Sequence, residues 1–347
     1  MQLKRSTSLL LTCLFVLVLQ IQPALSNPLR SDQPAAAALV SPEVFAPGLI
    51  SGPANDGTPA FSPDGNTIFF TRTNGNWNAI LESHKVNGQW SHPTLAPFSG
   101  QWSDSAPAMA PDGSYLIFES KRPIAPLSVR PGEGERIPGI VSNLWRVNRN
   151  GAGWSQPARL PSTVNLDGQS IWKCSIAADG AIYVTAIDSK RIKRIYVAQY
   201  RNGAYQQAQP LPFSDGTAED VDPEIAPDGS FLVFASAKRL PGDELDHLFI
   251  VARQGDGWGP VVPIRYAGDD KPSFSTDNEP HLSPDRRALY FSSDRAFPAQ
   301  YPRTPEQAQE DFKRLDSWGW FGGYSNVWVI PVEPYLNAAK SAAKGSS

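Results

Sequence analysis

In the stretch Ile225-Ala226-Pro227-Asp228-Gly229, an apolar residue, a small residue and Pro lead into an Asp-Gly pair. The same phrase, with small variations, recurs four more times along the chain: Phe61-Ser62-Pro63-Asp64-Gly65, Met109-Ala110-Pro111-Asp112-Gly113, Ile176-Ala177-Ala178-Asp179-Gly180 and Leu282-Ser283-Pro284-Asp285-Arg286. A repeat of roughly 40–60 residues that is built from short strands is typical of a β-propeller.

Each phrase lies between two extended runs, and the run after Gly229 reads Phe231-Leu232-Val233-Phe234. Asp-Gly between such runs predicts a tight hairpin, because Gly adopts positive φ without steric cost. The fifth copy has Arg286 in place of Gly, so we expect its turn to be of another type or strained. Third and fourth strands follow in the repeat, the fourth beginning near Trp90, Trp154, Tyr205 or Trp258. Four antiparallel strands make one propeller blade.

The fifth repeat lacks a fourth strand of its own. The segment 44–50 has the aromatic residue, the Pro and the Leu of a fourth-strand pattern, so we expect it to complete the last blade and close the ring. The sequence therefore predicts an all-β fold, a five-bladed propeller of four-stranded blades over residues 44–335. A six-bladed ring is the alternative, and it would need one blade without a recognisable phrase.

The phrase is accompanied by Ser-x-Arg or a near variant downstream, as at Thr71-Arg72, Ser120 to Arg122, Ser236 to Arg239 and Ser293 to Arg295. Together these residues resemble the WD-like repeat of the TolB-like periplasmic propellers, over residues 44–332. The resemblance implies an exported propeller that acts as a binding module, and it implies little about chemistry, because propellers also include scaffolds and enzymes. TolB proteins usually have six blades and an additional N-terminal domain, two features that this chain does not show.

The N-terminus has the pattern of an export signal. Lys4 and Arg5 precede an apolar run from Leu9 to Leu19, and small residues before Asn27 offer a cleavage site. We therefore expect residues 1–26 to be a signal peptide, 27–43 a disordered lead-in, 336–347 a C-terminal tail, and the mature protein to be periplasmic or secreted. No later run reaches the roughly 20 apolar residues of a membrane span, so no membrane insertion is expected.

Composition narrows the partners. Without residues 1–26 the chain keeps one of its two cysteines, Cys174, which excludes an internal disulfide and a cysteine-based zinc site. Loss of Lys4 and Arg5 changes the formal charge from −3 to −5, and no basic cluster is present. This mild acidity argues against nucleic acid as a partner. We expect a monomer that binds a glycan, or a protein or peptide of the cell envelope.

Loop lengths indicate which face of the ring is elaborated. The loops that lead into the first strands share a face with the loops between strands two and three. We call this the top face, and the opposite one, which carries the Asp-Gly turns, the hairpin face. Two long insertions, 123–142 and 296–325, both belong to the top face. Loops of this length are uncommon without a role, so we expect the top face to be the working face.

Ionisable residues of the entry loops and first strands fall into two sets. The first set lies eight residues before the Asp of each phrase, at Asp56, Asp104, Asp220 and Asp277, with Ile171 in the third repeat. A repeated Asp at one register is expected to cap a turn or to pair with the Ser-x-Arg arginine. The second set breaks the repeat, which has Thr, Ala or Ser at the same places, and gives the candidate catalytic residues Lys173, Asp222, Glu224, Glu279 and His281.

Aromatic residues gather in top-face loops, and they are the candidate ligand-binding residues: Trp102, Trp172, Trp318, Trp320 and Tyr324. Aromatic rings beside carboxylates suit a sugar, whose apolar face stacks while its hydroxyls form hydrogen bonds. For half of the aromatic residues between Trp318 and Tyr324, packing of the fifth-blade insertion onto the ring is the alternative.

Three functions remain open at this point. The first is a binding module without catalysis, and the second is a glycoside hydrolase or polysaccharide lyase. A hydrolase would use Asp222 or Glu224 with Glu279 as its two carboxylates, and a lyase would use His281 as the base with Lys173 to neutralise a uronate. The third is a scaffold. No nucleophile elbow, phosphate loop or His-rich metal motif is present. No cofactor is expected, although calcium would find oxygen ligands in the pore, where no loop has EF-hand spacing.

Overall fold

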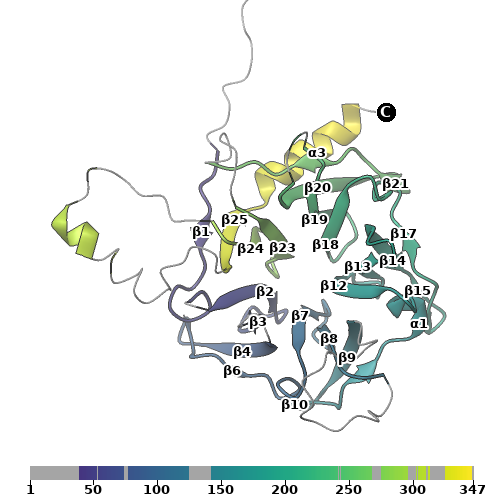
Figure 1. Cartoon of the computed structure of the whole chain (residues 1–347), viewed down its shortest axis with the longest axis horizontal. Helices are drawn as coiled ribbons and strands as arrows, with labels where there is room; N and C mark the ends of the chain where they lie inside the picture. The colour runs from purple at the N-terminus through teal and green to yellow at the C-terminus, as the bar shows by residue number, and fades with distance from the viewer. Residues whose placement is uncertain are drawn as a thin grey trace, which may run out of the picture. The chain divides into compact units, whose positions relative to one another are not determined.

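Five antiparallel sheets form a ring in the computed structural model, which describes residues 39–52, 54–73, 77–124, 142–240, 242, 244–267, 275–295, 302, 304–309, 312 and 325–345. These residues belong to one compact unit, 38–347. The innermost strands face the axis (Figure 1): β2 (Asn55–Phe61), β7 (Asp104–Met109), β12 (Ser170–Ile176), β18 (Glu219–Ile225) and β23 (Asp277–Leu282). Each contacts the next, and β23 contacts β2, so the ring is closed. The predicted five-bladed propeller is confirmed.

The other strands of each blade follow outward in chain order. The second strands are β3 (Thr67–Thr73), β8 (Tyr115–Ser120), β13 (Ile182–Ile187), β19 (Phe231–Ala237) and β24 (Ala288–Ser293). The third strands are β4 (Asn78–Val86), β9 (Asn143–Asn150), β14 (Lys193–Ala198), β20 (His247–Gln254) and β25 (Asn326–Pro331).

The fourth strands are broken into two-residue pieces, because Pro and polar residues interrupt the ladder at the rim. These pieces are β5 (Gln89–Trp90), β6 (Thr94–Leu95), β10 (Gly153–Trp154), β11 (Ala158–Arg159), β16 (Ala204–Tyr205), β17 (Gln209–Pro210), β21 (Gly257–Trp258) and β22 (Val262–Pro263). Strand β15 (Tyr200–Arg201) continues the third strand of blade three and pairs with β16. A single turn of helix, α1 (Ser162–Asn165), lies beside β9.

The N-terminal segment closes the ring, as predicted. Strand β1 (Glu43–Val44) pairs antiparallel with β25, and the N–H of Phe45 donates to the carbonyl of Val327 at 2.8 Å. The pairing is shorter than the predicted 44–50, because the chain turns away at Ala46, whose φ is +44°.

The Asp-Gly turns have the predicted left-handed residue. Gly65, Gly113, Gly180 and Gly229 have φ between +69° and +86°, and Arg286 has φ +59°. The fifth turn is therefore of the same kind as the others, with the strain that a side chain brings to this conformation.

The core consists of five apolar clusters, one between each pair of neighbouring blades. The second strands contribute from both faces, and all seven residues of β19 are buried. A strand that is covered on both faces reads as a continuous apolar run, which explains Phe231-Leu232-Val233-Phe234 in the sequence.

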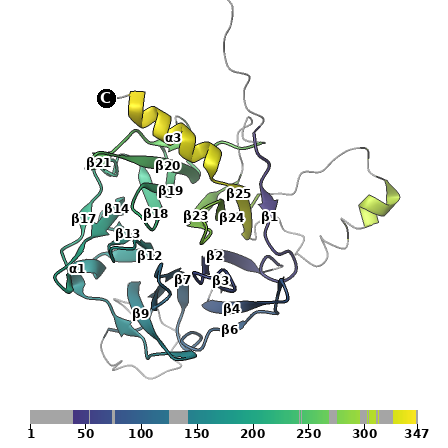
Figure 2. The ribbon, with the colours of Figure 1, turned by 180° about the vertical axis from the view of Figure 1, so that it is seen from behind.

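The C-terminal segment differs from the expected tail. Residues Glu333–Gly345 form helix α3, which packs on β20 and β22 at the edge of blade four (Figure 2). Tyr335, Ala339 and Ala343 are buried at a spacing of four residues, the period of one helix face. The side-chain amide of Gln254 donates to the carbonyl of Ala343 at 2.7 Å, so the helix is tied to the blade as well as packed on it.

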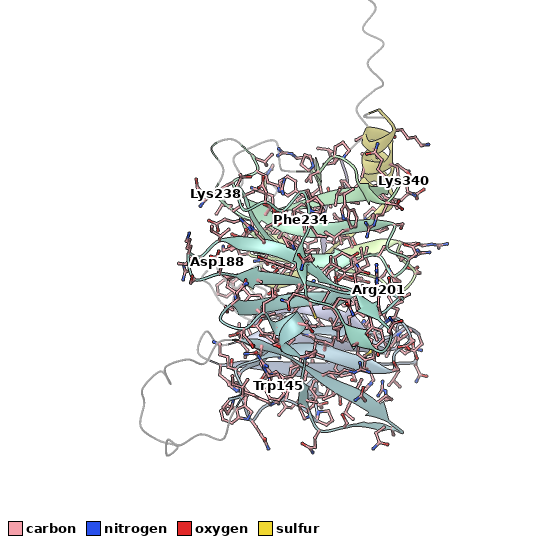
Figure 3. The ribbon with its side chains drawn as sticks, turned by 90° about the vertical axis from the view of Figure 1, so that its right-hand side faces the viewer. Trp145, Asp188, Arg201, Phe234, Lys238 and Lys340 are labelled. Atoms are coloured by element: carbon pink, nitrogen blue, oxygen red, sulfur yellow. The ribbon has the colours of Figure 1, made fainter. Side chains whose placement is uncertain are left out.

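The two faces of the ring are seen edge-on in Figure 3. Asp188 and Lys238, in the turns after β13 and β19, lie at one side, and Arg201 of β15 lies at the other. Gly180, in the Asp-Gly turn of blade three, lies against Tyr200, which is next to Arg201. The Asp-Gly turns and the turns after the second strands are therefore on opposite faces, as expected. No helix in the described part of the chain is long and apolar enough to cross a membrane.

Candidate functional site

The innermost strands share a β-bulge that brings polar groups to the axis. Register shifts occur in all five of them, and the bulged residue has positive φ in four: Thr58, Ala106, Asp222 and Glu279. A bulge leaves a backbone N–H outside the ladder. Side chains of the preceding blade supply the acceptor, because Ala106 N–H donates to Thr71 Oγ1 at 2.9 Å and Asp222 N–H donates to Thr185 Oγ1 at 2.8 Å. The bulges of β7 and β18 therefore link blade two to blade one and blade four to blade three.

Asp222 acts as the acceptor that blade four otherwise lacks. Thr71 and Ser292 occupy one register of the second strands, and Ala235 stands there in blade four. The carboxylate of Asp222 instead accepts the N–H of Glu279 at 3.2 Å. Burial, and then the charge of Glu279, raise the pKa of Asp222 to about 7. The Asp222 carboxyl group therefore keeps its proton to a higher pH than an exposed aspartate does.

Glu279 lies on the top-face side of this link. Its Oε2 accepts the hydroxyl of Ser292 at 2.5 Å and the N–H of Thr58 at 3.2 Å. Burial raises the pKa of Glu279, and these hydrogen bonds together with the charge of Lys173 oppose the rise. Glu279 is a bulge residue, a lining residue of a cavity and a neighbour of Asp222 at the same time.

A second group, nearer the hairpin face, consists of Glu224, Lys173 and His281. Oε2 of Glu224 lies 3.2 Å from His281 Nδ1 and 3.7 Å from Lys173 Nζ, and Lys173 also donates to the carbonyl of Pro280 at 2.7 Å. Lys173 is only 2% exposed. Burial tends to raise the pKa of Glu224, but the charge and hydrogen bond of His281 and the charge of Lys173 outweigh it and lower the pKa. Glu224 is thus held in its ionised form.

Glu224 also has a structural task. Its Oε1 accepts the N–H of Leu282 at 2.9 Å, which is the link that Ser175 Oγ makes with the N–H of Ile225 one blade earlier. Like Asp222, this carboxylate replaces a hydroxyl as an acceptor between blades.

Sequence reasoning missed Glu119, which belongs to the same axial cluster. It stands in β8 at the register of Thr71 and Ser292. Burial raises the pKa of Glu119 to about 7, opposed by hydrogen bonds from Ser142 and Ser105. Comparison of the second strands, instead of the first strands alone, would have revealed it as a break in the repeat.

Two cavities open at opposite ends of the axis. The top-face cavity has a volume of about 400 Å³ and is lined by Asn55, Asp56, Gly57, Thr71, Thr73, Thr276, Asn278, Glu279, Asp294 and Ser325. The hairpin-face cavity has a volume of about 270 Å³, includes Glu224 and His281, and has walls of Pro, Phe, Met, Ile and Leu. The structure thus brings the five candidate residues Lys173, Asp222, Glu224, Glu279 and His281 into one axial cluster. Glu279 lines the top-face cavity, Glu224 and His281 line the hairpin-face cavity, and Lys173 and Asp222 line neither.

The candidate aromatic residues are placed less favourably. Trp172 is half-buried, packs against the core between blades four and five, and has the Lys193 ammonium 5.8 Å from its ring. Trp102 is half-buried in the loop before β7. Neither residue lines the top-face cavity. Trp318, Trp320 and Tyr324 lie outside the described residues.

The repeated Asp residues pair with arginines, as the sequence suggested. Arg72, Arg122, Arg239 and Arg295 contact Asp56, Asp104, Asp220 and Asp277, respectively. Blade three has the fully buried Ile171 instead. Within the described residues, no group of three or more His, Cys, Asp or Glu side chains is arranged to hold a metal ion.

No family model matches the sequence, and no curated protein sequence matches it. Similar solved structures include TolB from Acinetobacter baumannii (TM-score 0.43, 16% identity), an α-L-arabinofuranosidase from Podospora anserina (0.47, 12%) and a gluconolactonase from Xanthomonas campestris (0.44, 13%). The matches cover 69%, 85% and 74% of this chain and 51%, 98% and 75% of those chains. This chain therefore spans about half the length of that TolB. TolB propellers are among the structures that it resembles, and no residue role is transferred from any of them.

Proposed function

We propose that this protein is an exported, TolB-like binding propeller that takes a hydroxyl-rich ligand, a glycan, in its top-face cavity. One observation carries the proposal: apart from Gly57, every residue that lines this cavity has a polar side chain. Amides, hydroxyls and carboxylates in a concave site match the alternating donors and acceptors of a sugar. The export pattern of residues 1–26 supports a periplasmic or secreted location.

Parts of the cavity are held in place by the fold. Oδ1 of Asn55 accepts the N–H of Ser325 at 2.8 Å, and Oδ1 of Asp294 accepts the N–H of Thr276 at 2.7 Å. The first bond joins blade one to blade five, and the second fixes the wall within blade five. A site whose polar groups are already positioned loses less entropy when it binds a ligand.

A carbohydrate-active enzyme is the second candidate, because the pKa values of the axial carboxyls are divided. The pKa values of Asp222 and Glu279 are raised and that of Glu224 is lowered, which is the division that a general acid and an ionised partner need. Against this reading, both oxygens of Glu224 already contact groups of the protein. Glu224 also lines the other cavity, away from the polar walls that would hold a sugar.

The test uses the mature chain, residues 27–347, on an array of immobilised glycans, followed by calorimetry with each hit and analysis of the ligand for cleavage. The Asn278→Ala and Glu279→Gln variants should weaken binding at least about tenfold, the loss of a well-placed hydrogen bond to a charged or polar group. Lys190→Ala, in a turn on the same face of blade three, serves as the control and should bind normally. Absence of any glycan hit, or equal affinity in all variants, would overturn the proposal in favour of a protein partner. Ligand cleavage that Asp222→Asn abolishes would favour the enzyme.

A further inference from the structure

In blades one, two and four, the hairpin after the third strand carries a repeated pair of residues on the hairpin face. A cation lies over the ring of a Trp directly across the strand pair: Lys85 over Trp90 at 4.9 Å, Arg149 over Trp154 at 4.2 Å and Arg253 over Trp258 at 3.9 Å. Blade three departs from this pattern. Tyr200 and Tyr205 are paired at the same register, with ring centroids 4.9 Å apart. Both members of the repeated pair have been replaced by tyrosine.

The tyrosine pair lies beside a groove between blades two and three. Tyr115 of β8 adds a third ring, which shares a side-chain hydrogen bond with Tyr205, and the guanidinium of Arg146 lies 3.6 Å from the centre of the Tyr115 ring. These four side chains line a cavity of about 480 Å³, together with Asp112 and Asp179 at the Asp-Gly turns of the two blades. The groove therefore combines aromatic rings, hydroxyls, a guanidinium and two carboxylates.

Packing explains two of the three tyrosines. Tyr115 and Tyr205 are half-buried and pack against the core between blades two and three. Tyr200 is 44% exposed, and its ring rests on the turn at Gly180, where a Cβ atom would lie 3.3 Å from it. The repeat has a cation at this position in three other blades, so the fold does not require an aromatic ring there.

We propose that this groove is a second carbohydrate site, in which a pyranose ring stacks on the exposed face of Tyr200. A rigid ring with an apolar face and a polar tip gives contact area at low entropic cost. The sugar hydroxyls would be held by Arg146, by the hydroxyl of Tyr205 and by the carboxylates of Asp112 and Asp179. Both carboxylates use Oδ1 within their own turns, so Oδ2 would bind the ligand. The site lies on the face opposite the top-face cavity, and ligand binding there does not depend on that cavity.

The test is a titration of protein carrying ¹³C-labelled tyrosine with four soluble probes: cellotetraose, xylotetraose, maltotetraose and N-acetylchitotetraose. At least one probe should shift the ring resonances of Tyr200 and Tyr205, assigned from Tyr→Phe variants, in a saturable way. The Tyr200→Arg/Tyr205→Trp double variant restores the pair that three other blades contain, so it should fold with an unchanged melting temperature and bind that probe at least tenfold more weakly.

Two controls separate this site from the top-face cavity. Tyr200→Phe keeps the ring and should keep the affinity, and Asn278→Ala should leave the tyrosine shifts unchanged even if it abolishes binding on the top face. The proposal is overturned if the Tyr200 resonance stays in place with all four probes up to about 10 mM, beyond the weak millimolar range of single-site binding. It is also overturned if a correctly folded double variant binds as well as the wild type.

Discussion

Replacing Asp220 by Ile, the residue that blade three has at this register, measures what one of the repeated Asp-Arg pairs contributes to stability. The Asp220 carboxylate is 1% exposed and accepts three charge-assisted or hydroxyl hydrogen bonds of 2.7 Å, from Nε and Nη2 of Arg239 and from Oγ of Ser236. Arg239 also donates to the carbonyl of Phe213 at 2.7 Å, and its guanidinium lies 5.3 Å from the centre of the Phe234 ring.

The magnitude follows from the burial of the two partners. Removing one partner of a buried pair costs about 3–5 kcal/mol, because the other charge is left uncompensated. The Arg239 side chain is 19% exposed and keeps Phe213, so Asp220→Ile should lie at the lower end, about 3 kcal/mol. Arg239→Ser leaves the nearly inaccessible carboxylate with Ser236 alone and should lie at the upper end, about 5 kcal/mol.

Blade three supplies the control for this experiment. Ile171 pairs with Ala186 as Asp220 pairs with Ser236, which places Ser189 where Arg239 stands. The Asp220→Ile/Arg239→Ser variant therefore gives blade four the blade-three pattern. It should lose much less stability than the sum of the two single variants, because neither buried charge is left without its partner.

The four proteins of this double-mutant cycle can be compared by calorimetric melting. A loss of 3 kcal/mol corresponds to roughly 6–12 °C in a large domain. A double variant whose loss of stability equals the sum of the two single-variant losses would show that the two residues are not coupled. A single variant that melts with the wild type would show that the pair contributes nothing to stability. Either result would show that Asp220 and Arg239 do not stabilise the blade as a buried pair.

Two further predictions concern Asp222 in the β-bulge and Arg286 in the fifth turn. Because the pKa of Asp222 is raised to about 7 from about 3.9 in an unfolded chain, the folded protein keeps a proton that the unfolded chain loses, and its stability falls as the pH rises from about 4 to about 7. Asp222→Asn keeps an acceptor for Glu279 N–H, so its melting temperature should equal that of the wild type at pH 4 and exceed it at pH 8; the opposite order at pH 8 would contradict the assignment. Arg286→Gly should raise the free energy of unfolding in urea by less than about 1 kcal/mol, because relief of left-handed strain (about 1–2 kcal/mol) exceeds the chain entropy that Gly adds (about 0.4–1 kcal/mol). Loss of the half-exposed ion pair between Arg286 and Asp228 offsets part of this gain, by about 0–1 kcal/mol. Gly229→Arg, at φ +70° with open space around it, should lower the free energy by a similar amount, and equal stability of both variants would contradict the strain.

The ring could be predicted from the sequence because its determinants are local. Each Asp-Gly turn specifies its own left-handed residue, and each second strand shows its burial as an apolar run. The C-terminal helix also left a local signal, the spacing of Tyr335, Ala339 and Ala343, but the propeller repeat gives no reason to look for a helix there. The role of Asp222 could not be predicted from its own strand. It depends on Ala235 in the next strand, whose side chain cannot accept a hydrogen bond.

The choice of the working face rested on loop length alone, and loop length says nothing about cavities between blades. The hairpin-face groove is formed by side chains of two blades, Tyr115 from one and Tyr200 with Tyr205 from the next. No single repeat of the sequence contains all three tyrosines. The sequence showed Tyr205 at the position of a repeated Trp, but its partner across the hairpin becomes informative only when the strand register is known.

Departures from a repeat can therefore be sorted by whether the fold compensates for them. Asp222 compensates for Ala235, and Glu224 makes with Leu282 the link that Ser175 makes with Ile225, so both carboxylates have structural duties that suffice to explain them. Ile171 is compensated in another way, because a fully buried apolar side chain needs no arginine. Tyr200 compensates for nothing: the fold accepts Lys or Arg at the same register, and almost half of the Tyr200 surface faces solvent. A polar residue whose absence would leave a neighbouring blade unsatisfied is explained by folding, whereas Tyr200 satisfies no group of a neighbouring blade, and this difference supports the proposed second site.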